Sequence, residues 1–476
     1  QLHQPLYEAW VRKAGDPDKH VPAWLKGGTP MGILRDPETA GIFPPVDQQV
    51  PASERSPLLE LDETFVNYSS IEESEHGQEV LDELVDKGFV KRYDSMEATV
   101  HALGGATPTL SKLALITTMK DGVLKHRLIL DCRVSGVNDH SHKVERVLLP
   151  SAWDIIHDTL AMRAKMKDGE SMRYMVLDFK DAFFMMPLLA EEVAFCGTFY
   201  KGRWYTCDRI AQGSINGPSV YGRLSALTGR MGQGMFDTTE LRTQVYIDDP
   251  CSVLRGTTER CDLLTARLVL LWLCLGWDLS YHKGQYHTAI NWIGYSIKVS
   301  DEYVIASIKE DFMMEFTTLI RDTLGKNLIS IDDLRSLAGK ANHIATLIYA
   351  WRPFMDQIWA AISQTKADNA PRGKVWVKAI SSSLEWLLLF LDSEPGALVR
   401  RWRLDYYFNP GVKVSIHLDA SPFGLGAVLI VAGFIRAWFA SPLSQHDLNT
   451  HNQEWGSSKG QQCWEALVLL VAGKMW

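Results

Sequence analysis

Two adjacent aspartates, in the stretch Tyr246-Ile247-Asp248-Asp249, are the residues of this sequence best placed to do chemistry. They stand between two short apolar segments, Gln244 to Ile247 and Cys251 to Leu254, which predicts a β-hairpin with the carboxylates at its turn. Neighbouring carboxylates repel each other, and a hard divalent cation with oxygen ligands relieves that repulsion. The alternative is an ordinary polar turn, which the stretch alone favours because Asp and Pro are common in turns.

A third carboxylate, Asp178, strengthens the metal-binding interpretation. It closes the apolar run Tyr174 to Leu177, which predicts a buried strand that ends in a carboxylate. If this strand and the Asp248 hairpin are neighbours in one sheet, the three carboxylates converge. Three convergent carboxylates can hold two Mg²⁺ ions about 4 Å apart, which is the arrangement for in-line phosphoryl transfer.

The rest of the pattern supplies the elements that would position these carboxylates. An amphipathic stretch predicts a helix between Ile71 and Lys91, and a capping box of Ser151 and Asp154 predicts a second one. We expect further helices at 261–275, 305–324, 331–348, 355–363, 375–391 and 461–472. We expect strands at 127–131, 195–200, 204–208, 290–299, 412–418, 424–431 and 434–440. Residues 1–70 are rich in Pro, Gly and acids, which predicts an extended, loosely structured lead-in.

Six ordered blocks make the chain resemble a reverse transcriptase of the LTR-retrotransposon and retrovirus type. They fall between residues 75 and 300 at family-like spacing, which is specific although each block alone is not. The blocks are Arg127–Arg133, Asp178–Phe184, Gln212–Pro218, Tyr246–Asp249, Leu275–Lys283 and Trp292–Tyr295. The resemblance implies an α+β right-hand fold of fingers, palm and thumb that copies an RNA or DNA template-primer with dNTPs.

The resemblance also implies roles for individual residues. Asp178, Asp248 and Asp249 would be the catalytic residues and the ligands of two Mg²⁺ ions, or of Mn²⁺ in their place. The implied nucleotide-binding residues are Lys120, Arg127, Asp181, Phe183, Gln212, Gly213 and Lys283. The implied primer grip is made of Trp292, Gly294 and Tyr295.

Each of these roles competes with a plain structural one. Phe183 falls where the family places a ring under the deoxyribose, and a ring there would exclude a 2′-hydroxyl. With Phe184 beside it, however, Phe183 is equally consistent with the hydrophobic core. For Lys120, Arg127 and Lys283 the alternative is solvated surface charge. For the Gly/Pro block and the primer-grip block the alternatives are an ordinary loop and a core strand.

The C-terminal third resembles a helical thumb followed by the start of a ribonuclease H domain. Residues Ser336–Asn342, followed by Arg352–Phe354, resemble the DIRS-type or hepadnavirus-type branch more than retroviruses. Asp419 ends a predicted strand and Glu465 lies on the last helix, and the resemblance makes them two of about four metal-binding carboxylates. Glu454 is a rival of Glu465 for this place. We expect a partial domain without RNA-strand cleavage and with an exposed sheet edge.

Composition limits the class of protein. The chain has 476 residues, of which 46% are hydrophobic and 22% charged, as in a globular protein of two or more domains. The net charge is −8, and the excess of acids lies within residues 1–110, so the rest can still carry a basic cleft. The seven cysteines have no zinc spacing and no C-x-x-C, which favours a reducing compartment and core positions.

No apolar run approaches the roughly 18 residues of a membrane span, and no leader peptide is visible. We therefore expect an intracellular protein, cytoplasmic or nuclear, with no membrane partner. The chain begins at Gln1 rather than Met, so we expect one piece of a longer polyprotein, whose other parts would be partners.

We predict a retroelement RNA-directed DNA polymerase with four parts. These are an acidic N-terminal extension (1–70), fingers and palm (71–300), a helical thumb and connection (301–405) and a partial ribonuclease H-like α/β domain (406–476). Three alternatives stay open: a decayed or domesticated copy that binds nucleic acid without catalysis, an RNA-dependent RNA polymerase, and an unrelated globular protein with chance matches.

Overall fold

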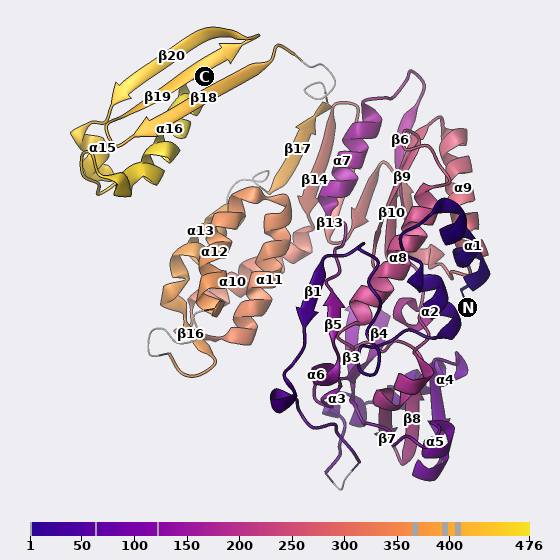
Figure 1. Cartoon of the computed structure of the whole chain (residues 1–476). Coiled ribbons are helices and arrows are strands. Elements are labelled where there is room, and N and C mark those ends of the chain that lie inside the picture. Colours follow the sequence, from indigo (N-terminus) through magenta and orange to yellow (C-terminus); the bar gives the residue numbers. More distant parts are fainter. Residues whose placement is uncertain (1, 62–63, 121–122, 364–369, 393–397, 405–410) are drawn as a thin grey trace. The chain divides into compact units, whose positions relative to one another are not determined.

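The computed structural model divides the chain into two compact units, Gln1–Arg401 and Trp402–Trp476 (Figure 1). It describes residues 2–61, 64–120, 123–363, 370–392, 398–404 and 411–476. Helices and strands alternate through both units, so the prediction of a mixed α and β protein is confirmed. Each unit is built around apolar side chains of its own.

A four-stranded antiparallel sheet in the order β11-β6-β10-β9 carries the predicted carboxylates. Its strands are β6 (Ser171–Val176), β9 (Leu241–Tyr246), β10 (Asp249–Gly256) and β11 (Gln285–His287). The helices that pack on it are α7 (Ala152–Arg163), α8 (Gly217–Gln233) and α9 (Thr258–Cys274). The expected capping box of Ser151 and Asp154 starts α7. The sequence therefore predicts this sheet and its first helix correctly.

A second group of strands adjoins this sheet in the first unit. It has a three-stranded sheet in the order β2-β8-β7 and a long hairpin of β3 and β4. The strands are β2 (Val90–Tyr93), β3 (Lys112–Lys120), β4 (Val123–Asp131), β7 (Gly197–Tyr200) and β8 (Arg203–Cys207). The helices nearby are α3 (Ser69–Glu72), α4 (Gly77–Asp86), α5 (Met96–Ala102) and α6 (Val137–His140).

Residues 1–70 are not a loosely structured lead-in, and that prediction is wrong. They form α1 (Gln4–Ala14), α2 (His20–Gly27) and β1 (Pro45–Gln48), which pairs with β5 (Lys143–Glu145). Tyr7 is fully buried, and its hydroxyl accepts a hydrogen bond from the indole of Trp277 at 2.8 Å. Asp18 is buried with Arg223 of α8. The acids that suggested a solvated segment thus include partners of buried arginines.

The second half of the first unit combines another sheet with four helices. The sheet has the order β12-β13-β14-β17, from β12 (Ala289–Trp292), β13 (Tyr295–Val299), β14 (Tyr303–Ile308) and β17 (Val399–Arg403). The single strand expected at 290–299 is therefore wrong, because Ile293 and Gly294 both adopt positive φ and turn the chain back. The helices are α10 (Glu310–Leu324), α11 (Ile331–Leu347), α12 (Arg352–Ser363) and α13 (Ser381–Asp392). Two short strands, β15 (Leu328–Ser330) before α11 and β16 (Lys374–Trp376) after α12, pair with each other in an antiparallel arrangement.

The second unit is a three-stranded antiparallel sheet with a helix packed on one face. The strands run in the order β18-β19-β20, and the elements are β18 (Val414–Ser421), β19 (Gly424–Val431), β20 (Phe434–Pro442), α15 (Gln445–Thr450) and α16 (Gln461–Met475). Trp464 of α16 is fully buried against Ala420 and Leu425 of the sheet. These strands and the last helix agree with the sequence pattern.

The cysteines and the membrane expectation can be compared with this fold. All seven cysteines are free and five are buried, so most serve as small core residues, as expected. Across the ranges that the structure describes, no helix combines the length and the apolar character needed to cross a membrane.

Candidate active site

The hairpin of β9 and β10 places Asp248 in its turn and Asp249 at the start of β10. Tyr246 pairs with Asp249 across the hairpin, which leaves Ile247 and Asp248 as a two-residue turn. Ile247 has a φ of +55°, which a turn of this kind requires but which is unfavourable for a β-branched residue. The hydroxyl of Ser225 on α8 donates to the carbonyl oxygen of Ile247 at 2.6 Å and supports the turn. Strained backbone of this sort is concentrated at functional sites.

Asp178 lies directly beside this turn. The backbone N–H of Phe179 donates to the carbonyl oxygen of Asp248 at 2.8 Å. On the other side, the N–H of Ser280 donates to the carbonyl oxygen of Asp178 at 2.9 Å. Asp178 follows the end of β6, and Asp248 precedes the start of β10. Because β6 and β10 pair directly, the two aspartates stand at the same edge of the sheet.

Two basic side chains act on these carboxylates. The ammonium of Lys283 donates to both carboxylate oxygens of Asp178, each at 2.7 Å. Burial raises the pKa of Asp248 above its ordinary value, and the negative charge of Asp178 adds to that rise. The positive charges of Lys283 and Arg127 lower the pKa of Asp248 in opposition. The site is thus a pair of interacting carboxylates whose repulsion is only partly relieved by bases.

The donor set fits a hard divalent cation. Asp178, Asp248 and Asp249 would offer carboxylate oxygens only. A cation between them would offset the burial of Asp248 and its repulsion by Asp178, which together raise the pKa of Asp248. In the described part of the chain, no three His, Cys, Asp or Glu side chains already form a group of metal ligands. Because Lys283 holds both oxygens of Asp178, metal binding there would have to displace this lysine.

Phe183 and Phe184 point to different surroundings although they are neighbours in the chain. The ring of Phe183 stacks on Tyr221 of α8 with a centroid distance of 4.9 Å. Tyr221 is buried, and burial raises the pKa of its hydroxyl. The negative charges of the three aspartates add to this rise. The ring of Phe184 stacks instead on Phe89 at 5.1 Å. Phe183 therefore lies on the side of the carboxylates, and Phe184 does not.

Asp181 adopts a φ of +52° just before the short helical turn that holds Phe183. Its carboxylate accepts a hydrogen bond from the ammonium of Lys87 at 3.1 Å. The side chain of Asp181 is therefore held by Lys87, which follows the end of α4. Its nucleotide-binding role stays a prediction.

The backbone of the loop at Gln212 and Gly213 lies directly against strand β4. The N–H of Leu130 donates to the carbonyl oxygen of Gln212 at 3.1 Å. Gly213 has a φ of +131°, and a Cβ atom there would lie 2.0 Å from the carbonyl oxygen of Leu130, so only glycine fits. Asn138 fixes the loop from the other side, because its amide donates to Gly213 O at 2.9 Å and accepts from Ile215 N at 2.9 Å.

The remaining basic candidates lie on the β3–β4 hairpin. Arg127 is exposed on β4, paired in register with Ile116 of β3, and close enough to influence the pKa of Asp248. Lys120 ends β3, and its side chain lies outside the described part of the structure.

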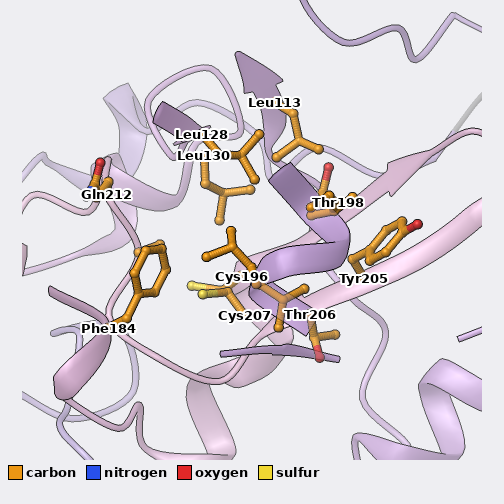
Figure 2. Close-up of a pocket in the computed structure, with 14 residues that line it drawn as sticks. Leu113, Leu128, Leu130, Phe184, Cys196, Thr198, Tyr205, Thr206, Cys207 and Gln212 are labelled. Atoms are coloured by element: carbon orange, nitrogen blue, oxygen red, sulfur yellow. The ribbon is translucent and has the colours of Figure 1, made fainter. Parts of the chain in front are cut away.

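A small apolar cavity of 30 Å³ lies beside this block (Figure 2). Leu128 and Leu130 of β4, together with Phe184, Cys196 and Cys207, surround it, and Gln212 forms part of its wall. A void this small has room for about one water molecule but offers almost no polar partner, so we expect it to stay empty.

The β12–β13 hairpin connects the aspartate turn to helix α11. The indole nitrogen of Trp292 donates to the carbonyl oxygen of Asp249 at 3.0 Å. Gly294 has a φ of +87°, and a Cβ there would lie 2.7 Å from the imidazole of His343. The hydroxyl of Tyr295 donates to the carbonyl oxygen of His343 at 2.8 Å. Trp292 and Tyr295 are both buried. The primer-grip role of this hairpin stays a prediction.

Four supporting residues of this site were missed by the sequence analysis: Asn138, Tyr221, Ser225 and His343. All four lie on helices, Asn138 on α6 and the others on α8 and α11, where a lone Asn, Ser, Tyr or His has no distinctive pattern. They act through tertiary contacts that sequence periodicity cannot show.

The second unit places Asp419 and Glu465 on neighbouring elements. Gln461 of α16 donates to the carbonyl oxygen of Ala420 at 2.7 Å and to the carboxylate of Glu465 at 2.8 Å. Asp419, Glu465 and the rival Glu454 are all exposed. The predicted metal site in this unit therefore stays a prediction.

No protein-family model and no curated protein matches this chain. Among solved structures, a foamy viral protease-reverse transcriptase in complex with dsDNA is 14% identical, with a TM-score of 0.49, over 84% of this chain and 61% of that chain. A second dsDNA complex is 13% identical with a TM-score of 0.46, over 94% of this chain and 82% of that one. A complex with an RNA/DNA hybrid is 14% identical with a TM-score of 0.46, over 94% and 53%. This chain thus spans about three fifths of the first of these proteins.

Proposed function

We propose that this chain is the RNA-directed DNA polymerase of a retroelement, which extends a primer with dNTPs on an RNA or DNA template. One observation carries the proposal. Asp178, which closes β6, lies beside the turn that carries Asp248, because Phe179 and Asp248 share a backbone hydrogen bond of 2.8 Å. A turn of two adjacent aspartates next to a third one is the constellation that two-metal nucleotidyl transfer needs.

The three aspartates would hold two Mg²⁺ ions, or Mn²⁺ in their place. When bound, these ions would lower the pKa of the primer 3′-hydroxyl and balance the charge of the departing pyrophosphate. Lys283 already stands within hydrogen-bond distance of Asp178. Displaced from Asp178, its ammonium would be free to pair with the phosphates of the nucleotide.

The nucleotide would lie between the aspartates and the β3–β4 hairpin. Arg127 projects positive charge toward Asp248, and Lys120 lies on the same hairpin, so both would bind the triphosphate. Gly213 lets the backbone pack closely, so that Gln212 can contact the base or sugar. Phe183, stacked on Tyr221, would lie under the deoxyribose and exclude a 2′-hydroxyl.

The primer terminus would be positioned by the β12–β13 hairpin through Trp292, Gly294 and Tyr295. The C-terminal unit would be a ribonuclease H-like piece with Asp419 and Glu465 as metal ligands. We place the protein inside the cell, as part of a polyprotein that also supplies its other partners.

The test is incorporation of dTTP on a poly(rA)/oligo(dT) template-primer with Mg²⁺. We expect the wild-type chain to extend the primer and Asp248→Asn to lose at least about a hundredfold in rate. The matched control is Asp82→Asn, which breaks an exposed ion pair with Arg92 and should keep its activity.

Equal activity in the wild-type chain and Asp248→Asn would show that the catalytic assignment is wrong. A folded wild-type chain that binds the template-primer but never extends it would favour the copy without catalysis. Extension with rUTP as readily as with dTTP would favour an RNA polymerase instead.

A further inference from the structure

Arg209 forms the common wall of two adjoining surface grooves in the first unit. The larger groove has a volume of 690 Å³, and Lys180, Asp181, Trp277 and Asp278 line it. The smaller one has a volume of 550 Å³, and its lining residues are Lys91, Tyr93, Glu191 and Asp208 among others. Arg209, Gly88 and Pro187 belong to both grooves, so the two form a continuous depression around the guanidinium.

The backbone of Arg209 is held firmly. Arg209 follows β8 and forms an isolated bridge with Pro187. The N–H of Leu188 donates to Asp208 O at 3.0 Å, and the N–H of Ile210 donates to Met186 O at 3.0 Å. The guanidinium itself lies over the ring of Phe89, 5.9 Å from its centroid. The side chain is therefore presented to the grooves from a rigid support.

No acid pairs with this arginine. Among the described residues, no carboxylate lies within ion-pair distance of Arg209. Burial lowers the pKa of its guanidinium, and the negative charge of the neighbouring Asp208 opposes this in part. The nearby acids are engaged elsewhere: Asp208 with Lys91 at 2.5 Å, Asp181 with Lys87 at 3.1 Å, and Asp278 with Lys180 at 3.8 Å. A half-buried guanidinium is thus left without the anion that its planar set of donors is suited to bind.

We propose that Arg209 anchors a binding site for a phosphate anion in this groove, and that its ligand is pyrophosphate. The guanidinium would bind two phosphate oxygens in a fork. Lys87 and Lys180, which line the same groove, would exchange their present partners Asp181 and Asp278 for the outer oxygens. Lys180 and Asp181 follow Asp178 closely in the chain, so the groove reaches the segment that carries the candidate active site.

A compact anion suits this groove better than a nucleic-acid strand. The lining acids offset the lysines along its length, whereas binding of a phosphate backbone relies on continuous positive charge. The use of the site by the pyrophosphate released in polymerisation rests on the proposed function. The binding of the anion does not, because it needs only the groove.

The experiment is calorimetric titration of the whole chain with inorganic pyrophosphate, without divalent ions and at constant ionic strength. The variant Arg209→Met keeps the apolar stem on Phe89 but removes the charge. We expect saturable binding to the wild-type chain and a loss of affinity of at least about tenfold in Arg209→Met. The matched control, Arg203→Met, removes an exposed arginine at the start of β8 and should bind like the wild-type chain.

Thermal unfolding of each variant checks that the fold is retained. Equal affinity of the wild-type chain and a folded Arg209→Met variant would overturn the assignment, and so would absence of pyrophosphate binding to the wild-type chain. A single-stranded oligonucleotide that binds in an Arg209-dependent way, while pyrophosphate does not, would overturn it in favour of a strand. If the chain binds pyrophosphate through Arg209 but has no polymerase activity, the anion site is supported. Only its role in polymerisation is then rejected.

Discussion

The indole nitrogen of Trp292 donates to the backbone carbonyl of Asp249 at 3.0 Å, across two different sheets of the first unit. The ring of Tyr246 meets Trp292 edge-on at 6.4 Å and closes the contact. This places a residue of the proposed primer grip directly on the turn of the proposed catalytic aspartates. The position of the primer terminus and the position of the metal ligands would then be fixed together.

Trp292→Phe should therefore slow extension of a primer without unfolding the protein. The substitution keeps a ring in the buried space but removes the hydrogen bond from the indole to the Asp249 carbonyl, at a cost of about 1 kcal/mol. We expect a severalfold decrease in kcat for dTTP incorporation. Trp153→Phe is the control, because the Trp153 indole donates to Thr346 O, away from the aspartates. Equal decreases in both variants would assign the effect to general loosening of the fold.

Phe183→Val should admit ribonucleotides. If the ring of Phe183 excludes the 2′-hydroxyl, a smaller side chain should raise the ratio of rNTP to dNTP incorporation by about tenfold or more. Phe184→Val is the matched control, because Phe184 stacks on Phe89 and not on Tyr221. The measurement is kcat/KM for dTTP and rUTP on one template-primer. An unchanged ratio in Phe183→Val would show that Phe183 is a hydrophobic core residue and does not select the sugar.

Local patterns in the sequence predict the carboxylates and the strands that carry them. Asp248 and Asp249 stand in a short polar interruption of apolar residues, and Asp178 ends an apolar run, so both signals are contained within a few neighbouring residues. The structure pairs β6 with β10, which is the neighbourhood that the sequence analysis set as the condition for the carboxylates to converge. Both the hairpin and the adjacent buried strand are present in the structure.

The rest depends on contacts between residues far apart in the chain. Asp18 looks like one more acid in a polar segment until it is placed beside Arg223. The apolar residues from Ile290 to Val299 favour one continuous strand, and the lone Gly294 was a turn signal that this pattern outweighed. His343 is half-buried because the Gly294 turn, Tyr295 and Phe312 pack against it. Periodicity describes one element at a time and is silent on these pairings.

The same contact between His343 and the Gly294 turn should make stability depend on pH. Burial lowers the pKa of His343 below 6.5, although a hydrogen bond with the Gly294 backbone opposes this in part. Near pH 6.5 the unfolded chain therefore takes up a proton before the folded chain does. The contribution of His343 is complete above this pH and is lost as the pH falls through the lowered pKa.

The prediction is tested by urea unfolding of the wild-type chain and His343→Gln between pH 7.5 and 5. We expect the wild-type chain to lose more stability than His343→Gln as the pH falls through this range. Tyr295, which faces His343, has a pKa raised to about 12 by burial and does not titrate here. His101→Gln removes an exposed histidine on α5 and should follow the wild-type curve. Parallel curves for wild type and His343→Gln would contradict the prediction.

Asp18→Ala should destabilise the first unit strongly, because the N-terminal helices are part of its core. Both carboxylate oxygens of Asp18 accept from the guanidinium of Arg223, at 2.6 and 2.8 Å, and both side chains are almost completely buried. Asp18→Ala leaves Arg223 with only the longer of its two buried ion pairs, to Glu145 at 3.5 Å. Loss of one partner of a buried ion pair costs about 3–5 kcal/mol. The measurement is the free energy of unfolding of the first unit in urea. Asp332→Ala, which breaks an exposed pair with Arg335, should cost less than about 1 kcal/mol. Equal costs in the two variants would mean that α1 and α2 can leave the core without penalty, as an extended lead-in would.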